Sequence, residues 1–448
     1  MKRSRRMPLK GFYLIVFGMV MSASQLCWAT SHERQVSDQL PILRLSLHDA
    51  MAVAVEQNPT VRLSKERTTE AQSVADTRLG ELLPNLSGRM SGARRRLFFG
   101  SFGRDPVVAD PDRLYETRAV LTQNVFSLSL IQKWRAAKIG VQVAGMDADV
   151  TKRDTMATVG LVYLETLRAQ EAVQAREADV ALSRELLRLT SKRRAAGMAT
   201  SLDVNRAHVR FKDARQRWLV AQNERDRATL NLIRAIGLSF DVDLVLTDRL
   251  RIASVPEQSI DQALIIAENN RVELKAQKQK ERLAALTLST VQSERVPSLQ
   301  ASGDVGLIGN KLNNMLTNNN VQLMMTIPIF DGGQREGRVS ENRSRIRQEI
   351  IRTQDIRYQI SLEVRDAILS LRSAKQQVQE AEEGLTLALT EVKLARKRFA
   401  VGVATNIEVT DAQTFVAKAR DNRIESLFNF NAARINLARA QGRLQDIR

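Results

Sequence analysis

The spacing of apolar residues changes in the same order twice along the chain. Two segments, beginning near Leu45 and Ser259, place apolar residues three and four positions apart, which predicts helices with one buried face. Ser46 and Ser259 are N-cap candidates, because a serine oxygen can accept a hydrogen bond from a free N–H of the first turn. Pro84 and Pro297 mark the ends of these segments. Two equivalent helical segments are therefore expected.

After each proline the pattern alternates between apolar or small residues and polar ones, the period of a strand. The predicted β-hairpins are 85–126 and 298–330, with second strands at 115–126 and 321–330, and the asparagine-rich segment 310–320 is expected to be a loop. These strands are close to the ~9–11 residues that cross a bilayer when tilted. Unpaired backbone groups are costly in lipid. Because spanning barrels begin at about 8 strands, four strands per chain predict self-association, and three copies would supply about 12.

Each predicted hairpin is followed by a long stretch without proline. The stretches are 127–196 and 331–401, rich in alanine, leucine, arginine, glutamate and glutamine. If continuous, each makes a helix of roughly 105 Å at ~1.5 Å per residue. Helices of this length are typical of coiled coils and bundles.

The corners that follow the long stretches are duplicates of each other. RAAGMATSLDV begins at Arg194 and FAVGVATNIEV at Phe399, and aligning 192–237 with 397–442 without gaps gives 16 identities in 46 positions. An internal repeat of this kind predicts two copies of one structural unit. We expect a first repeat at 30–257, with a helical hairpin at 127–236, and a second at 258–448, with a helical hairpin at 332–442.

The residues of both corners suit sharp helical hairpins. Gly197 and Gly402 can adopt the left-handed conformation that ends a helix. Thr200 with Asp203, and Thr405 with Glu408, match a capping box that starts the next helix. The returning helices are expected at about 201–236 and 406–442.

The N-terminus predicts export from the cytoplasm. Residues 1–29 combine a cationic start, an apolar run too short to span a bilayer comfortably, and small residues before a cut after Ala29, as in a secretory signal peptide. An N-terminal anchor helix and lipid attachment at Cys27 are alternatives. Cys27 is the only cysteine, so cleavage after Ala29 would leave a mature chain that cannot form disulfides. The net charge of +18 suits nucleic acid or anionic lipid, but aromatic residues make up only 4%. Because bases need stacking platforms, no nucleic-acid partner is expected.

The duplicated order of helix, proline, β-hairpin, long helix, corner and returning helix resembles the TolC family of outer-membrane efflux proteins. The second copy carries the words Ile327-Pro-Ile-Phe-Asp-Gly-Gly333 and Arg398-Phe-Ala-Val-Gly402, and the first carries Glu56-Gln-Asn-Pro59 and Gln123-Asn-Val-Phe126. The resemblance covers about 45–445. In two departures, Ser127-Leu-Ser stands where the family has Asp-Gly-Gly, and Val272 stands where a proline is common.

The resemblance implies a mainly α fold with a β-barrel portion. It implies a TolC-like trimeric α/β barrel, with four strands per chain in a 12-stranded barrel and long periplasmic coiled-coil helices. The implied function is the outer-membrane exit duct of a tripartite efflux or type I secretion system. The implied partners are two further copies in a homotrimer, a periplasmic adaptor protein, an inner-membrane pump or ABC exporter, and outer-membrane lipid. The alternative is a periplasmic or surface coiled-coil scaffold, which would have no need for membrane-length hairpins.

The corner residues are the candidate site. By the resemblance, Glu408 and Asp411 occupy acidic positions that narrow the pore entrance, although Glu408 also suits a capping role. Asp203 is the equivalent of Glu408 in the first copy and is expected to cap its helix or contribute to the gate. Arg206 can pair with Glu408 or Asp411, or be a solvated helix residue. Phe399 and Ala404 stand where the family has a latching tyrosine and arginine.

The outermost loops are the candidate docking tips. They contain Gly197, Met198, Gly402 and Val403, which the resemblance places against the adaptor, although helix termination alone would also explain them. The nearby basic runs 192–194 and 397–398 suit adaptor carboxylates or helix C-termini. Arg94-Arg95-Arg96 is expected near outer-membrane lipid or in a charged loop.

No catalytic or cofactor constellation is expected. The three histidines, His32, His48 and His208, are far apart in sequence and lack metal-ligand spacing. The chain has no Gly-x-Ser-x-Gly nucleophile motif. The sequence therefore predicts neither an enzyme nor a cofactor.

Overall fold

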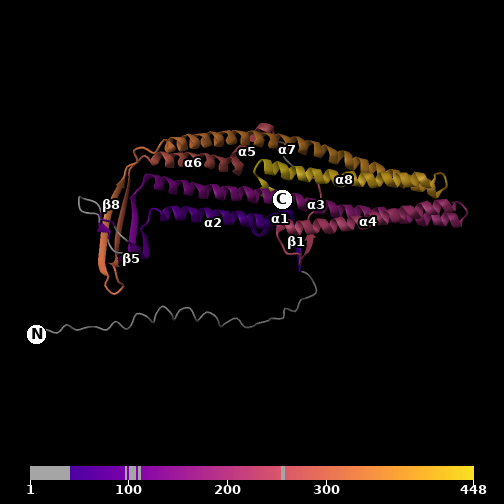
Figure 1. The fold of residues 1–448 in the computed structure, drawn as a ribbon. Helices are drawn as coiled ribbons and strands as arrows, with labels where there is room; N and C mark the ends of the chain where they lie inside the picture. The colour runs from indigo at the N-terminus through magenta and orange to yellow at the C-terminus, as the bar shows by residue number, and fades with distance from the viewer. Residues whose placement is uncertain (1–40, 96–97, 100–106, 109–111, 254–257, 448) are drawn as a thin grey trace. The chain divides into compact units, whose positions relative to one another are not determined.

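The long proline-free stretches form the two longest helices of the computed structural model (Figure 1). α3 spans Leu128–Ala195 and α7 spans Gln334–Ala400, 68 and 67 residues, or roughly 100 Å each at ~1.5 Å per residue. Both predicted helices are confirmed.

The structure describes residues 41–95, 98–99, 107–108, 112–253 and 258–447. The chain divides after Pro41, and the expected signal peptide 1–29 lies outside the described residues.

The helical segment at the start of each half is divided into two helices. The four helices are α1 (Leu47–Gln57), α2 (Pro59–Gly80), α5 (Ile260–Asn270) and α6 (Val272–Ser293). Ser46 and Ser259 cap α1 and α5, as predicted. Asn58 is extended because it precedes Pro59, which has no N–H to continue the helix. Arg271 is also extended although Val272 follows it instead of proline, so the second break does not require proline.

The two hairpins join into one antiparallel sheet in the order β2-β5-β7-β8. The strands are β2 (Asn85–Arg95), β5 (Asp112–Phe126), β7 (Ser298–Gly309) and β8 (Leu316–Thr326). A separate two-residue pair joins β3 (Phe98–Phe99) to β4 (Val107–Val108). Among the described residues, β2 and β8 each pair on one side only. The sheet therefore has two open edges in a single protomer.

The second strand of the second hairpin was predicted in the wrong place. The sequence pattern indicated 321–330, with 310–320 as a loop, but β8 spans Leu316–Thr326. Thr317–Asn320 pair with Asp304–Leu307 of β7, so cross-strand pairing outweighs the low strand propensity of asparagine. Pro328 cannot donate to a ladder, and the strand ends before it.

The strand register gives the sheet one mainly apolar and one mainly polar face. Side chains of Leu86, Met90, Leu121, Val305 and Leu323 fall on the apolar face because alternate residues of a strand point the same way. The opposite face carries Ser87, Arg89, Glu116, Arg118, Asp304, Asn320 and Gln322. Arg118 Nη1 pairs with Asp304 Oδ2 at 2.7 Å across the sheet.

The helices that join the strands pack in the same order as the strands. α2 packs on α3, α3 on α6, and α6 on α7. α4 (Ser201–Ile236) returns along α3, and α8 (Asn406–Ala440) returns along α7 and also packs on α3 (Figure 1). Ser127, one of the departures from the family pattern, is the N-cap of α3. Among the described residues, no helix is long and apolar enough to cross a membrane.

A core that the sequence did not reveal forms where α1, α3, α4 and α8 meet. There β1 (Ile42–Leu45) pairs in parallel with β6 (Asp243–Leu246), and the C-terminal turn η1 (Leu444–Asp446) packs against α3 and α8. The buried Tyr163 hydroxyl lies 3.0 Å from both the Leu45 carbonyl oxygen and Asp248 Oδ2. Burial and the charge of Asp248 raise the pKa of Tyr163. Tyr163 therefore remains a neutral hydrogen-bond donor that ties β1 to α3.

Candidate functional site at the helical hairpin tips

Both long helices end in the same backbone motif, as the duplication predicts. After α3, Gly197 has φ +73°, and the N–H groups of Gly197 and Met198 donate to the carbonyl oxygens of Arg194 and Arg193 at 2.9 and 2.8 Å. After α7, Gly402 has φ +88° and forms the equivalent turn. These bonds satisfy the last free carbonyl groups of each helix. The two corners are therefore well-defined turns.

The returning helices are capped differently. Thr200 and Asp203 form the predicted capping box, and the hydrogen bonds from Thr200 hold the pKa of the Asp203 carboxyl below its ordinary value. Thr405 accepts a hydrogen bond from the Glu408 N–H at 3.4 Å, but the Glu408 side chain does not return to the cap. Its Oε2 lies 3.7 Å from Arg398 Nη1. The capping-box prediction is thus confirmed for Asp203 and wrong for the Glu408 side chain, which the Arg398 cation attracts outward.

Arg193 connects the two hairpins at their tips. Its guanidinium lies over the Phe399 ring, 4.5 Å from the centroid. The same group donates hydrogen bonds to the Phe399 and Met198 carbonyl oxygens. The sequence predicted for the basic run 192–194 only that it binds adaptor carboxylates or suits a helix C-terminus. The partner of Arg193 at 399 is more than 200 positions away, so no local pattern could identify the contact.

An apolar cluster lies directly behind this contact. Phe399 is only 4% exposed, and Ala404 also lies in the cluster. The other buried members are Leu186, Ala207, Ala388, Val392, Ala395, Val409, Ala412 and Val416. They come from α3, α4, α7 and α8, so the two hairpins share one core near the tips. Phe399 and Ala404 are therefore packing residues here.

A polar seam continues the contact between α3 and α8. Asp179 accepts hydrogen bonds from Arg420 Nη1 at 2.6 Å and Arg176 Nη1 at 2.9 Å. Burial raises the pKa of Asp179, although both arginines oppose that shift. Farther along the seam, Arg168 Nη1 pairs with Glu425 Oε2 at 2.7 Å. The seam therefore holds the two hairpins together through ion pairs.

The remaining candidate residues lie on the exposed side of the tips. Met198 and Val403 are 63% and 70% exposed. Glu408 and Asp411 are exposed and three positions apart on α8, which places them on one helix face. Arg206 is exposed on α4, and among the described residues of one protomer it forms no ion pair with either carboxylate. Nor do the described ranges contain a cluster of three or more metal-ligating side chains.

Removing the Arg193 guanidinium is expected to loosen the tips. In Arg193→Gln, the ring contact and the charged hydrogen bonds disappear, which together contribute about 1–3 kcal/mol. Hydrogen–deuterium exchange of the 402–409 amides is expected to rise roughly tenfold, because local opening of the tip becomes easier. Arg194→Gln is the matched control, since Arg194 is exposed. Equal exchange rates in wild type and Arg193→Gln would show that Arg193 does not stabilise the tips.

Known proteins resemble this chain over most of its length. The family model for outer membrane efflux proteins matches residues 50–238 and 264–443. TolC of Escherichia coli is 20% identical over 73% of this chain and 69% of its own length. The alkaline protease secretion protein AprF of Pseudomonas aeruginosa is 22% identical over 87% of this chain and 82% of its own length.

Solved structures show the same fold. The outer-membrane channel OprN superposes with a TM-score of 0.76 at 16% identity, covering 88% of this chain and 89% of that chain. The Campylobacter jejuni CmeC outer membrane channel gives a TM-score of 0.75 at 15% identity, covering 90% and 87%. The mainly α fold with a barrel-forming sheet is therefore confirmed.

Proposed function

The chain belongs to the outer membrane efflux protein family, and from that premise we propose that three copies form the exit duct of a tripartite efflux or type I secretion system. The protein is an outer-membrane channel that extends into the periplasm. Relatives named for efflux and for protease secretion support both kinds of system. The names of these relatives do not identify the cargo of this chain.

A stripe of exposed apolar residues on α7 is the observation that carries the trimer proposal. Ile351, Tyr358, Leu362 and Leu369 are 66%, 67%, 62% and 59% exposed. Their spacing places them on one side of α7, opposite the buried residues Ile360, Val364 and Ala367. Beyond the polar residues Gln376 and Glu380, Leu387 and Leu394 are again exposed on the same side, nearer the tip. A stripe of this length indicates a helix partner.

The open sheet edges support the same conclusion. β8 leads into α7, and β2 follows α2, so each edge strand adjoins an outer helix of the packed row. Open edges are not stable in lipid, since each unpaired backbone group costs several kcal/mol there. In the proposed trimer, β8 and α7 of one copy lie against β2 and α2 of the next. Three four-stranded sheets then close a barrel of about 12 strands.

The two faces of the sheet suit such a barrel. The apolar face with Leu86, Met90 and Leu323 would contact the acyl chains of outer-membrane lipid. The polar face with Arg118 and Asp304 would line the water-filled interior. At the outer end of β2, exposed Arg94 is suited to lipid phosphate groups.

The tips are the proposed docking surface for a periplasmic adaptor protein. Exposed Met198 and Val403 would give apolar contacts, and exposed Lys192 and Lys397 would attract adaptor carboxylates. The adaptor would connect the duct to an inner-membrane pump or ABC exporter, which supplies the energy. The chain itself acts as a passive conduit, without catalysis or cofactor. Its two repeats, 30–257 and 258–448, would each supply one β-hairpin and one helical hairpin.

The gate is proposed to open by separating the two helical hairpins. Arg193, Phe399 and the Asp179 seam hold α3 and α4 against α7 and α8 in the closed state. Asp203 fixes the start of α4, and Arg206 is available for a carboxylate of a neighbouring protomer. Glu408 and Asp411 from three copies would place about six carboxylates around the entrance.

Neutralising these carboxylates is expected to reduce cation preference. In Glu408→Gln/Asp411→Asn, the cation-to-anion permeability ratio should fall at least about twofold, because the entrance no longer concentrates cations. Single-channel recording in planar bilayers measures the ratio. Asp366→Asn/Glu380→Gln is the control, since both residues lie on α7 away from the tip. An unchanged permeability ratio in Glu408→Gln/Asp411→Asn would contradict the proposal that these carboxylates surround the pore entrance.

Envelope fractionation combined with conductance tests the function directly. The exit duct predicts recovery with the outer membrane and discrete channel openings after reconstitution. The rival, a periplasmic or surface coiled-coil scaffold, predicts a soluble chain without conductance. Recovery of the unmodified chain as a soluble periplasmic species would contradict the duct.

A further inference from the structure

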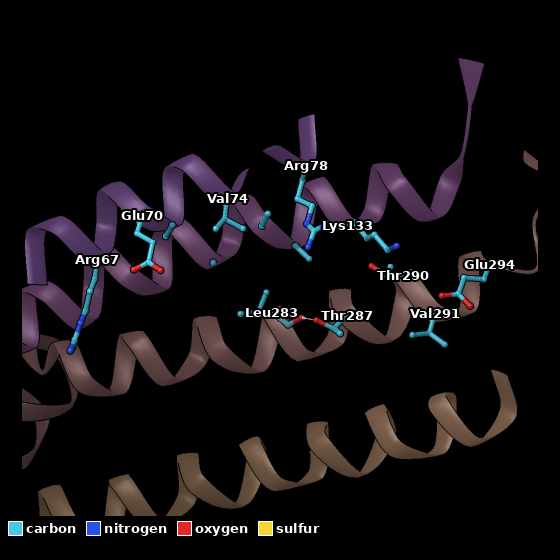
Figure 2. A pocket seen from close by; sticks show the side chains of 14 residues that line it. Arg67, Glu70, Val74, Arg78, Lys133, Leu283, Thr287, Thr290, Val291 and Glu294 are labelled. Atoms are coloured by element: carbon cyan, nitrogen blue, oxygen red, sulfur yellow. Dashed lines mark hydrogen bonds between the residues drawn. The ribbon is translucent and has the colours of Figure 1, made fainter. Parts of the chain in front are cut away.

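We propose that the cavity between α2, α3 and α6 binds an amphipathic organic anion. The cavity has a volume of about 770 Å³, which is in the range of small-molecule sites. It lies within one protomer, so this proposal does not rest on the duct or on the trimer. Figure 2 shows side chains from these helices lining it.

Small residues on α3 create the cavity. Ala136, Ala137 and Gly140 line it from the middle helix, where longer side chains would fill the space. α2 and α6 both pack on α3, and they contribute Val74, Leu283 and Val291 to the lining. The resulting surface is largely apolar and suits a flat hydrocarbon body.

The apolar lining faces away from the central core. Lys133 and Tyr163 are separated by 30 positions on α3, or roughly 120° around a helix at ~100° per residue. Tyr163 faces the core, so the cavity lies on another side of the helix. A ligand can therefore enter without disrupting the packing around Tyr163.

The charges at the sheet end of the cavity favour an anion. Arg78 is near the end of α2 and Lys133 near the start of α3, and both line the cavity. The carboxylate at this end, Glu294, already forms an ion pair with Arg338. Arg78 pairs with Glu81. No ion pair between described residues involves Lys133, so its ammonium is available to a ligand.

The far end of the cavity has a balanced pair of charges. Arg67 and Glu70 both line it there and lie one helix turn apart on α2 (Figure 2). Their opposite charges offset each other. The uncompensated positive charge of the cavity is therefore the ammonium of Lys133. A ligand with one anionic group and one apolar body matches this distribution, with the anion at Lys133 and the body over Val74 and Leu283.

The probe for this site is 2-naphthalenesulfonate, and 2-naphthylmethanol is its neutral counterpart. The full chain with Cys27→Ser and Thr287→Cys, labelled with bimane, reports binding from inside the cavity in zwitterionic phosphatidylcholine nanodiscs. Saturation by the sulfonate is expected at roughly millimolar concentration or below, given the size of the probe. The alcohol should bind about tenfold more weakly, because it lacks the charge–charge contact.

Variants of α3 separate this site from general adsorption. Lys133→Gln should weaken sulfonate binding about tenfold and leave alcohol binding unchanged, whereas Lys133→Arg should retain sulfonate binding. Lys138→Gln is the matched control, since Lys138 is exposed on the same helix and lies over Trp134 instead of in the cavity. Thermal unfolding verifies that each variant is folded.

Three results would overturn the inference. They are equal affinity for sulfonate and alcohol, equal weakening by Lys133→Gln and Lys138→Gln, and no saturable signal from the labelled residue. Conductance is recorded on the same labelled protein after it is transferred to planar bilayers. Binding without conductance would contradict the duct but support the anion site. Conductance without binding would contradict the anion site but support the duct.

Discussion

Replacing Leu362 and Leu369 of α7 with glutamate is expected to lower the yield of trimers at least about tenfold. Both side chains are more than half exposed in the protomer and would be buried against α2 of the next copy. Each buried leucine contributes about 1.5–3 kcal/mol, and three interfaces per trimer multiply the loss. Burying an unpaired glutamate adds a further cost. The expected loss therefore weakens each interface and disfavours assembly of the trimer.

Native mass spectrometry of protein released from nanodiscs gives the number of chains per particle. Wild type is expected at three chains, and Leu362→Glu/Leu369→Glu is expected to give at least about tenfold fewer three-chain particles. Ile350→Glu is the control, because Ile350 is 52% exposed on the same helix but lies away from the stripe, ~100° around the helix from Ile351. An unchanged yield of trimers in the double variant, or an equal loss in the control, would show that the stripe is not the interface.

Replacing Gly306 with alanine is expected to prevent the sheet from forming. A Cβ at Gly306 would lie 2.2 Å from the Thr117 carbonyl oxygen and 2.8 Å from Arg118 Cγ. The first contact is with backbone, so β5 and β7 would have to separate. The absence of a side chain at Gly306 also leaves room for Arg118, which lies opposite it, to reach Asp304 two residues along β7. Overpacking alone costs about 1–3 kcal/mol, and loss of the central strand pair adds to that.

The amount of folded chain in the outer-membrane fraction measures this effect. Gly306→Ala is expected to fall at least about tenfold below wild type, since every copy in the barrel carries the defect. Gly303→Ala is the matched control on the same strand, where a Cβ would meet only the Asn320 carbonyl oxygen at 3.8 Å. Normal assembly of Gly306→Ala would contradict the β5–β7 pairing.

The helices and corners were predictable because their signals are local. Proline-free stretches, a glycine at the end of a helix and a threonine three positions before an acid all act within one or two turns. The duplication made both corners easier to recognise. For this reason the bounds of α3, α7 and α4 closely match the expectation.

Features that depend on distant partners were not predictable from local pattern. β8 begins in an asparagine-rich segment because β7 is available to pair with it. In the sequence, Arg193 does not differ from other cations near a helix C-terminus. Its contact with Phe399 forms only in the folded chain. The cavity beside Lys133 depends on three helices meeting around small residues. In each case packing between distant segments determines the outcome.

Electron cryomicroscopy of the full chain in lipid nanodiscs tests the central claim most directly. The account predicts a threefold particle in which β8 of each copy pairs with β2 of the next and closes a barrel of about 12 strands. A solitary protomer, a different number of copies, or a particle whose sheets remain open would contradict it.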